Sequence, residues 1–189
     1  MAATVMSNVA ADRRRLTRRQ ALTTTSRGAG MAKELHIVGF RIGRETFGVP
    51  IALVHEIVRV PEITAVPDSP GYVEGVINLR GKIVSVVDLR KRFGEKEITA
   101  NKKNRIMVTE VEGKMVGLIV DAASEVLKIA ENEVELPPSV FDEGELNYVT
   151  GVGKLKGRLI ILVDLSKILQ KGELRRLGEI ASQTAAASA

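Results

Sequence analysis

An internal repeat is the sequence feature that most limits how this chain can fold. The segment YVEGVINLRGKIVSVVDL, residues 72–89, returns as YVTGVGKLKGRLIILVDL at residues 148–165, with nine of 18 positions identical at an offset of 76. A weaker pair, FGVPIALVHEIVRV at 47–60 and VGLIVDAASEVLKI at 116–129, has an offset of 69. Two copies are too few for a solenoid. The repeat therefore predicts two homologous half-domains packed about a pseudo-dyad.

The spacing of the repeat also predicts an insertion and a boundary. The two offsets differ by seven, so the second copy carries seven additional residues between its modules. These fall in ELPPSVFDEGELNY, residues 135–148, whose prolines and polar residues are typical of a loop. The polar stretch GEKEITANKKN, residues 94–104, lies between the copies. We expect the boundary between the two subdomains there.

Short β-branched segments fill most of the remaining sequence. ELHIVGFRIG, GVINL and KIVSVVDL are separated by glycine, proline or polar turns, and NRIMVTEVEGKMVGLIVD contains Glu112-Gly113 as a hairpin turn. Many short strands at close spacing predict a mainly β chain built from small barrels. We expect helix only at residues 88–93 and 164–177, with Asp88 and Asp164 as N-caps. From Gly178 onward the chain lacks a core pattern, and we expect a frayed tail.

Charge and composition exclude several classes of function. The first 30 residues carry six arginines and one aspartate, which accounts for the whole net charge of +5 and leaves a neutral body. A neutral body with four phenylalanines and two tyrosines argues against nucleic-acid binding. The chain has no cysteine, which excludes disulfides and fits a reducing compartment. No apolar run is long enough to cross a membrane.

The N-terminal segment differs from the rest of the chain in composition. We expect residues 1–30 to be a disordered basic extension, with Met31 as the natural start. The alternative is a basic arm that contacts acidic partners.

The chain offers almost no residues for catalysis or metal binding. The two histidines, His36 and His55, lie on strand-like segments without metal-ligand spacing, so we expect both to face solvent. The alternating carboxylates Glu131, Glu133 and Glu135 are typical of a solvated edge. No glycine-rich phosphate loop precedes a helix, and no nucleophile elbow occurs. The sequence therefore predicts no catalytic residue, no cofactor and no metal. A chain rich in apolar residues but without such groups is typical of a protein that binds other proteins.

One stretch carries a more specific pattern. GVINLRGKIVSVVDLR, residues 75–90, places Arg80-Gly81-Lys82 between two apolar runs, and Val54, Glu56 and Ile57 form a Val-x-Glu-Ile segment before it. The Gly-Val-x-Asn-Leu-Arg-Gly and Asp-Leu-Arg patterns in this stretch, with YVTGVGKLKGRLIILVDL later, resemble the CheW-like family of bacterial chemotaxis coupling proteins over about residues 35–169. Ser85 departs from the resemblance, since the family usually has proline there. Serine can donate a ladder hydrogen bond that proline cannot, so a more regular strand is expected.

The resemblance implies a fold, a role and partners. It implies a CheW-like domain at 31–177, built from two intertwined SH3-like five-stranded β-barrel subdomains with short helices after the barrels, and no catalysis. It implies an adaptor between two protein partners, the regulatory domain of the histidine kinase CheA and the cytoplasmic tip of methyl-accepting chemoreceptors. We therefore expect a cytoplasmic location at receptor arrays, without insertion into the membrane.

The resemblance also implies a binding site. Arg80 and Glu56 match family positions tied to receptor coupling, and a charge pair between them would fix the loop. The equivalent of Arg80 in the second copy is Lys156, which lacks the planar guanidinium fork, so one copy is expected to be functional and the other mainly structural. We expect a groove between the subdomains for a receptor helix. The residues assigned to partner binding are Val54, Glu56, Ile57, Val76, Asn78, Leu79, Arg80, Gly81, Val120 and Asp121.

Several alternatives remain open from the sequence. Arg80 could be only a solvated turn residue. The chain could be another protein of the same domain type, a nucleic-acid-binding barrel with a basic face, or an enzyme with an unfamiliar pocket of perturbed carboxylates. The residues of the kinase interface are not specified by the sequence.

Overall fold

The computed structural model describes residues 33–95, 98–137, 147–155 and 157–187. The predicted N-terminal extension and most of the predicted loop at 135–148 lie outside these residues. The strands are β1 (Glu34–Ile42), β2 (Glu45–Pro50), β3 (Val54–Arg59), β4 (Val73–Leu79), β5 (Lys82–Asp88), β6 (Arg105–Val111), β7 (Lys114–Val120), β8 (Ala122–Ala130), β9 (Val134–Glu135), β10 (Val149–Leu155) and β11 (Arg158–Val163). The helices are η1 (Ile51–Leu53), α2 (Leu89–Arg92), η2 (Glu131–Glu133), α3 (Leu165–Ile168) and α4 (Lys171–Ala187).

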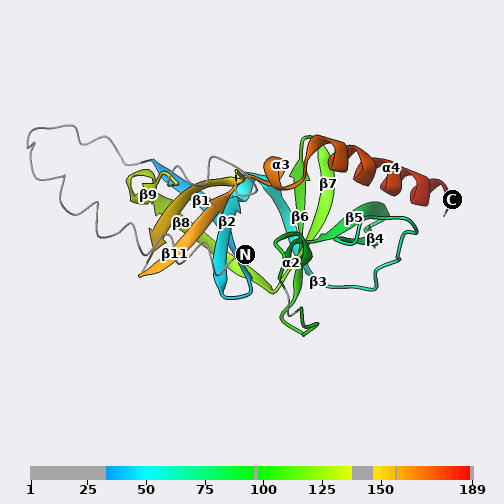
Figure 1. The fold of residues 1–189 in the computed structure, drawn as a ribbon, viewed down its shortest axis with the longest axis horizontal. Coiled ribbons are helices and arrows are strands. Elements are labelled where there is room, and N and C mark those ends of the chain that lie inside the picture. Colours follow the sequence, from blue (N-terminus) through cyan, green and yellow to red (C-terminus); the bar gives the residue numbers. More distant parts are fainter. Residues whose placement is uncertain (1–32, 96–97, 138–146, 156, 188–189) are drawn as a thin grey trace, which may run out of the picture.

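The strands form two sheets that lie side by side along the long axis of the molecule (Figure 1). Sheet A has six strands in the order β8-β1-β2-β11-β10-β9, and sheet B has five in the order β3-β6-β7-β5-β4. The mainly β prediction is confirmed, but sheet A has one strand more than expected and neither sheet closes into a barrel within the described residues. In sheet B a single bridge between Thr64 and Val76 joins the chain after β3 to the far edge strand β4. Pro61, two residues after the end of β3, has no N–H to extend the ladder.

Each sheet combines strands from both halves of the chain. The β1–β2 hairpin lies in sheet A, but β3, which follows it, lies in sheet B. The β6–β7 hairpin lies in sheet B, but β8, which follows it, lies in sheet A. Residues 94–104 therefore connect α2 to β6 within sheet B, and the expected boundary there does not separate the two sheets.

The strand registers reproduce the sequence repeat. In sheet B the parallel pairing of β5 with β7 sets Val86 opposite Gly117, and in sheet A that of β11 with β2 sets Leu162 opposite Gly48. These pairs are related by the offsets of 76 and 69 found in the sequence. Both copies also have a bulge at the same place, between Val73 and Gly75 in β4 and at the corresponding positions of β10. The two copies are therefore structurally equivalent.

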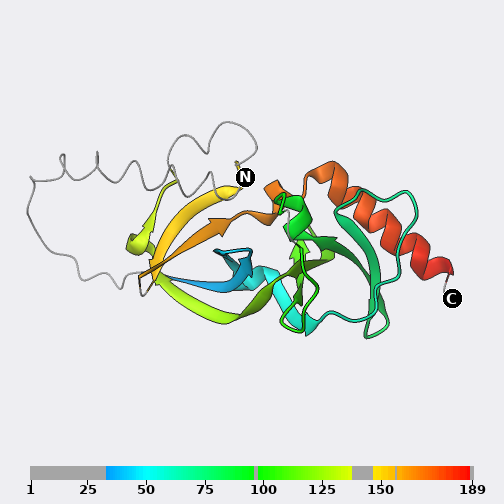
Figure 2. The same cartoon turned by 60° about the horizontal axis from the view of Figure 1, so that its bottom comes forward.

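A shared hydrophobic core joins the two sheets. It contains Val49 of sheet A, Leu118 of sheet B and Leu89 of α2, all fully buried. Phe93, at the end of α2, lies between Phe47 and Tyr148, with ring centroids 5.2 and 5.1 Å apart. Helices α2 and α3 lie at the junction of the sheets, and Figure 2 shows the same arrangement from a second direction. The sheets therefore pack as one body around these short helices.

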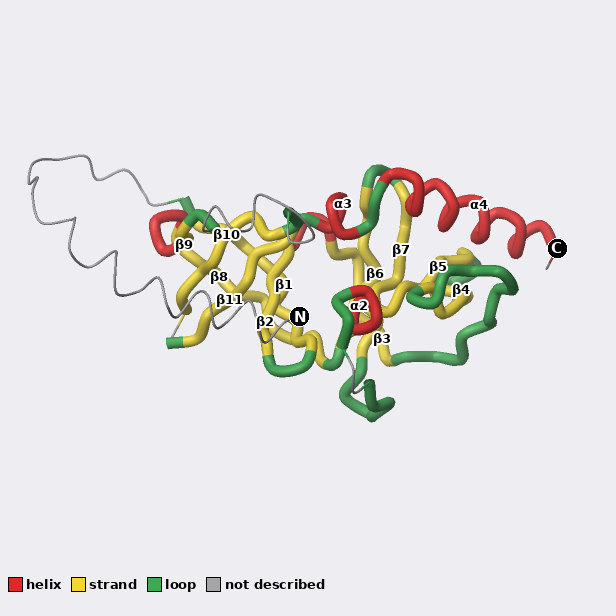
Figure 3. Tube along the Cα trace, in the orientation of Figure 1, coloured by secondary structure: helices red, strands yellow, loops and turns green. Residues whose placement is uncertain are grey.

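The helix predictions are confirmed in part. Asp88 Oδ1 accepts a hydrogen bond from Arg90 N and Asp164 Oδ1 accepts one from Ser166 N, both at 2.9 Å, so both aspartates are N-caps. The single helix expected at 164–177 is divided into α3 and α4, and α4 continues to Ala187 where a frayed tail was expected (Figure 3). Its C-terminal half is rich in alanine, the strongest helix former, and so needs no apolar stripe to be helical. Among the described residues, no helix has the length and apolarity needed to cross a lipid bilayer.

Helix α4 is fastened to the outer face of sheet B. Leu174 and Leu177 are buried in the shared core, and the Ser85 hydroxyl of β5 donates to the Leu177 carbonyl at 2.7 Å. Ser85 itself is buried. The departure from proline noted in the sequence therefore provides a buried hydroxyl that anchors this helix.

Candidate partner-binding site

The β4–β5 hairpin places Arg80 at the tip of sheet B. Arg80 and Gly81 are the two central residues of a tight turn, with φ of 52° and 85°, as in a type I′ turn. The Asn78 side chain accepts a hydrogen bond from Gly81 N at 2.9 Å and braces this turn. A left-handed conformation costs a non-glycine residue about 1–2 kcal/mol, so glycine or asparagine would suit the turn better. Turn geometry alone does not explain an arginine at position 80.

The expected charge pair between Arg80 and Glu56 is confirmed. Arg80 Nη2 lies 3.0 Å from Glu56 Oε2, with 81% of the arginine side chain and 26% of the glutamate side chain exposed. Glu56 follows an irregularity in the β3–β6 register, and a bulge of this kind redirects a side chain. At this exposure the pair contributes about 0–1 kcal/mol to stability. Its main effect is to orient a guanidinium whose other N–H groups are open to solvent.

The surface around this pair combines exposed and half-buried residues of β3 and of the β4–β5 hairpin. Asn78 and Gly81 are exposed at the turn, Ile57 is 36% exposed on β3, and Val54 and Leu79 are half-buried. Val54 packs against the shared core and Leu79 against the smaller core inside sheet B. The exposed part of this surface is therefore mostly polar, and Ile57 is its exposed large apolar residue.

Two predicted groove residues are buried. Val76 is 2% exposed and Val120 is 0% exposed, so their side chains do not line a surface. Val120 ends β7, and β7 lies in sheet B because of the strand exchange between the halves. The predicted residues therefore do not face one another across the two sheets.

The structure brings Asp121, the last predicted residue, into a buried charge cluster that the sequence reasoning did not assign. Arg90 Nη2 lies 2.7 Å from Asp88 Oδ2, and Arg90 Nη1 lies 3.3 Å from Asp121 Oδ1. The exposed fractions of these side chains are 7% for Arg90, 2% for Asp88 and 20% for Asp121. Hydrogen bonding to Asp88 raises the pKa of Arg90 above its ordinary value, although burial opposes this shift. Arg90 could have been singled out because its repeat equivalent is Ser166.

The two histidines and the alternating carboxylates that the sequence singled out lie at exposed positions. His36 and His55 are exposed as expected, and His55 Nε2 lies 2.9 Å from Glu110 Oε2. The carboxylates Glu131, Glu133 and Glu135 are also exposed, as expected. Within the part of the chain that the structure describes, no three histidine, aspartate or glutamate side chains are grouped so that they could hold a metal ion.

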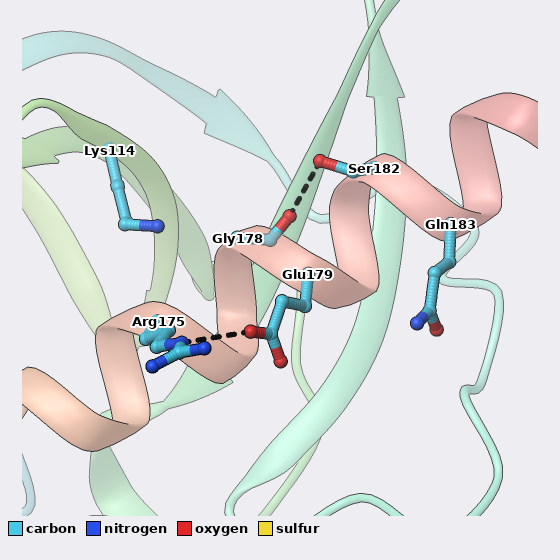
Figure 4. A pocket seen from close by; sticks show the side chains of 6 residues that line it. All are labelled: Lys114, Arg175, Gly178, Glu179, Ser182 and Gln183. Carbon is cyan, nitrogen blue, oxygen red and sulfur yellow. Dashed lines mark hydrogen bonds and ion pairs between the residues drawn. The ribbon is translucent and has the colours of Figure 1, made fainter.

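A shallow hollow of about 340 Å³ lies beside α4 (Figure 4). Its lining residues are Lys114, Arg175, Gly178, Glu179, Ser182 and Gln183. The bonds within it connect successive turns of the helix: Arg175 Nε donates to Glu179 Oε1 at 3.0 Å, and the Ser182 hydroxyl donates to the Gly178 carbonyl at 2.9 Å. None of the predicted binding residues lies in this hollow.

Comparisons with known proteins agree with the family resemblance found in the sequence of the β4–β5 hairpin. The model of the CheW-like domain family matches residues 36–173. Chemotaxis protein CheW of Klebsiella aerogenes is 31% identical over 160 residues, covering 85% of this chain and 96% of that protein. Chemotaxis protein CheW of Rhizobium meliloti is 35% identical over 137 residues, covering 72% and 88%. The crystal structure of the scaffolding protein TtCheW from Thermoanaerobacter tengcongensis matches with a TM-score of 0.68 and 40% identity, covering 75% of this chain and 96% of that one.

Proposed function

This chain belongs to the CheW-like domain family, and from that premise we propose that it is a non-enzymatic adaptor of bacterial chemotaxis. In this role it couples chemoreceptors to the histidine kinase CheA. The relatives are named chemotaxis proteins, and the solved relative is named a scaffolding protein. The observation that carries the proposal is Arg80, held in a strained turn and oriented by Glu56 at the tip of sheet B.

The receptor arm of the proposal uses the tip of sheet B. The cytoplasmic tip of a methyl-accepting chemoreceptor is a helical hairpin, and a helix docks through apolar anchors with polar contacts around them. Arg80 and Asn78 offer hydrogen-bonding groups at this tip, and Ile57, which follows Glu56 on β3, offers an exposed apolar side chain. Val76 and Val120 are buried, so their side chains are not offered to a partner in this proposal.

The kinase arm of the proposal uses a sheet edge. The CheA regulatory domain resembles this family, so two domains of one architecture would meet through strand edges. Strand β8 is an edge of sheet A, and its Val126 is 60% exposed. An edge on sheet A leaves the tip of sheet B free for the receptor. Both partners place the adaptor in the cytoplasm, beside receptor arrays.

Calorimetric titration against each partner tests the proposal. The isolated CheA regulatory domain and a soluble receptor-tip fragment are titrated separately into wild type, Arg80→Ala and Arg158→Ala. Arg158 is an exposed cation beside the equivalent turn of the second copy, so it controls for loss of charge alone. We expect wild type to bind both partners, Arg80→Ala to lose affinity for the receptor fragment only, and Arg158→Ala to behave as wild type.

Other outcomes contradict specific parts of the proposal. Absence of kinase binding by the folded wild type removes the kinase arm. Loss of kinase binding in Arg80→Ala moves Arg80 to the kinase interface. Equal losses in Arg80→Ala and Arg158→Ala show that general charge, and not the oriented guanidinium, attracts the receptor.

A further inference from the structure

The chain passes from sheet B to sheet A at Asp121, between β7 and β8. One carboxylate oxygen, Oδ2, accepts a hydrogen bond from Gly43 N in the β1–β2 turn of sheet A at 2.8 Å. The other, Oδ1, accepts one from Arg90 Nη1, next to sheet B, at 3.3 Å. The backbone of Asp121 also donates to the Arg41 carbonyl at 3.0 Å. A single residue thus bonds to elements of both sheets.

Arg90 is held too firmly to follow Asp121 if the sheets move. Its Nε donates to Asp88 Oδ1 at 2.9 Å and its Nη2 donates to Asp88 Oδ2 at 2.7 Å, which is a bidentate pair. Its Nη1 also lies 3.4 Å from the Thr99 carbonyl. With 7% of the side chain exposed in a close-packed interior, the guanidinium is restrained by these bonds and by its neighbours. Through Asp88 at the end of β5, the guanidinium that bonds to Asp121 is anchored to sheet B.

The second crossing, from β2 through η1 to β3, lacks such a tie. The repeat equivalent of Asp121 is Ala52, at an offset of 69, and the equivalent of Arg90 is Ser166, at an offset of 76. Ala52 is exposed and has no polar side-chain group. The Ser166 hydroxyl donates to Asp164 of its own cap at 2.6 Å. Among the described residues, the crossing at Asp121 has a charged tie and the equivalent crossing at Ala52 has none.

We propose that Arg90 and Asp121 are positioning residues that fix the angle between sheet A and sheet B. Buried ion pairs add little net stability compared with apolar packing, and conformational specificity is one role they can serve. Here the ion pair selects one mutual orientation of the sheets around their shared core. If the proposed adaptor function holds, this angle sets the geometry between partners bound to different sheets. Asp121 then acts through the fold and not by touching the receptor.

A distance measurement between spin labels tests the proposal without any partner. The chain has no cysteine, so Lys82→Cys on β5 and Lys154→Cys on β10 provide two unique label sites on exposed positions of the two sheets. Pulsed electron–electron double resonance then measures the distance between the two labels. It is recorded for this double-cysteine parent and for the same protein carrying Asp121→Asn, Asp121→Ala or the control Asp164→Ala. Asp164 caps α3 and has no part in the tie between the sheets.

We expect one narrow distance peak in the parent protein and a broadened or divided peak in Asp121→Ala. Asp121→Asn should give intermediate broadening, because its amide oxygen can still accept from Gly43 N while its charge is lost. Asp164→Ala should keep the parent width. A parent-like width in both folded Asp121 variants would overturn the proposal, and if Asp121→Ala does not fold, Asp121→Asn decides. Equal broadening in Asp164→Ala would also overturn it, by tracing the motion to general loosening of the junction.

Discussion

The ends of the two repeat copies have the same backbone but different side chains. Asp88 N donates to the Tyr72 carbonyl and Asp164 N donates to the Tyr148 carbonyl, both at 2.8 Å. Each aspartate caps a helix of four residues. Two positions further on, the first copy has Arg90 in a buried charge cluster and the second has Ser166 in a local cap. Duplicated backbones can therefore acquire separate roles through one side chain each.

The largest expected difference between the copies comes from removing that side chain. Arg90→Ala leaves Asp88 as a buried charge without its partner, which typically costs about 3–5 kcal/mol. Ser166→Ala removes one hydroxyl bond and keeps the backbone cap, at a cost of about 1 kcal/mol. Urea denaturation of both variants measures the two free energies of unfolding. Equal costs would show that the two junctions do not differ in the way their side chains indicate.

The paired bulge glycines should also respond unequally. A Cβ on Gly75, where φ is +139°, would lie 2.0 Å from the Thr64 carbonyl oxygen, which is backbone and cannot turn away. A Cβ on Gly151 would lie 2.7 Å from Val134 Cγ1, the end of a side chain. We expect Gly75→Ala to cost about 2–4 kcal/mol and Gly151→Ala about 1 kcal/mol in unfolding free energy. A harmless Gly75→Ala would mean that the Thr64–Val76 bridge yields easily.

Tyr72 should give the first copy a distinct response to alkaline pH. Burial, and then its 2.5 Å hydrogen bond to Glu173, raise the pKa of Tyr72 to about 12 from 10.0. The fold therefore favours the neutral phenol, and this contribution to stability is complete below pH 10 and lost as the pH rises through about 12. The chain has two tyrosines, so absorbance at alkaline pH can follow them, and Tyr72→Phe should remove a step near pH 12. A step near pH 10 lost in that variant would contradict the prediction.

The docking of α4 is a further difference between the copies. Ser85 bonds to the helix, whereas its repeat equivalent, Ile161, is a buried apolar residue of sheet A. Ser85→Ala should cost about 1 kcal/mol, the usual value for one hydrogen bond, and hydrogen exchange of the α4 amides should quicken. Ile161→Val serves as the matched control and should leave α4 exchange unchanged. Unaltered exchange in Ser85→Ala would assign the anchoring of α4 to Leu174 and Leu177 alone.

The smallest expected effect on stability is at the proposed binding tip. Arg80→Ala should change the unfolding free energy by less than about 1 kcal/mol. The pair with Glu56 is exposed and adds little stability. Alanine and arginine are both strained in the left-handed conformation, so the substitution does not change the cost of the turn. Thermal unfolding should therefore be close to wild type even where receptor affinity falls. A large loss of stability would mean that Arg80 is structural, and its binding effect could no longer be read as a contact.

The sequence predicted the strands and the equivalence of the copies because both depend on local patterns. Apolar alternation, turn glycines and the two offsets are all short-range features. It did not predict which sheet each strand would join. Offsets of 69 and 76 fit two separate half-domains as well as two sheets that exchange hairpins. The pairings that join the two halves of the chain distinguish these arrangements: β3 with β6 and β5 with β7 in sheet B, and β8 with β1 and β11 with β2 in sheet A.

The candidate site was predicted in the same uneven way. The pair of Glu56 and Arg80 could be predicted because both residues lie in motif segments of the family pattern, and the structure confirms it. Val76 and Val120 were assigned to a groove, yet a strand pattern does not say which face of a curled sheet is covered by other elements. Arg90 was not assigned because the Asp-Leu-Arg segment reads locally as a helix start. The comparison of that segment with Asp164-Leu165-Ser166 contains the missing signal.

The exchange of strands between the sheets also determines how long each part of sheet A waits for its partner strands during synthesis. The β1–β2 hairpin is made early, but its neighbours in sheet A, β8 and β11, emerge much later. Until then both edges of the hairpin lack a partner strand from the same nascent chain, at synthesis rates of about 5–20 residues per second. Two chains emerging close together can complete each other's sheets, because the missing strands are identical. We therefore expect misassembly of this chain to take the form of hairpin-exchanged dimers.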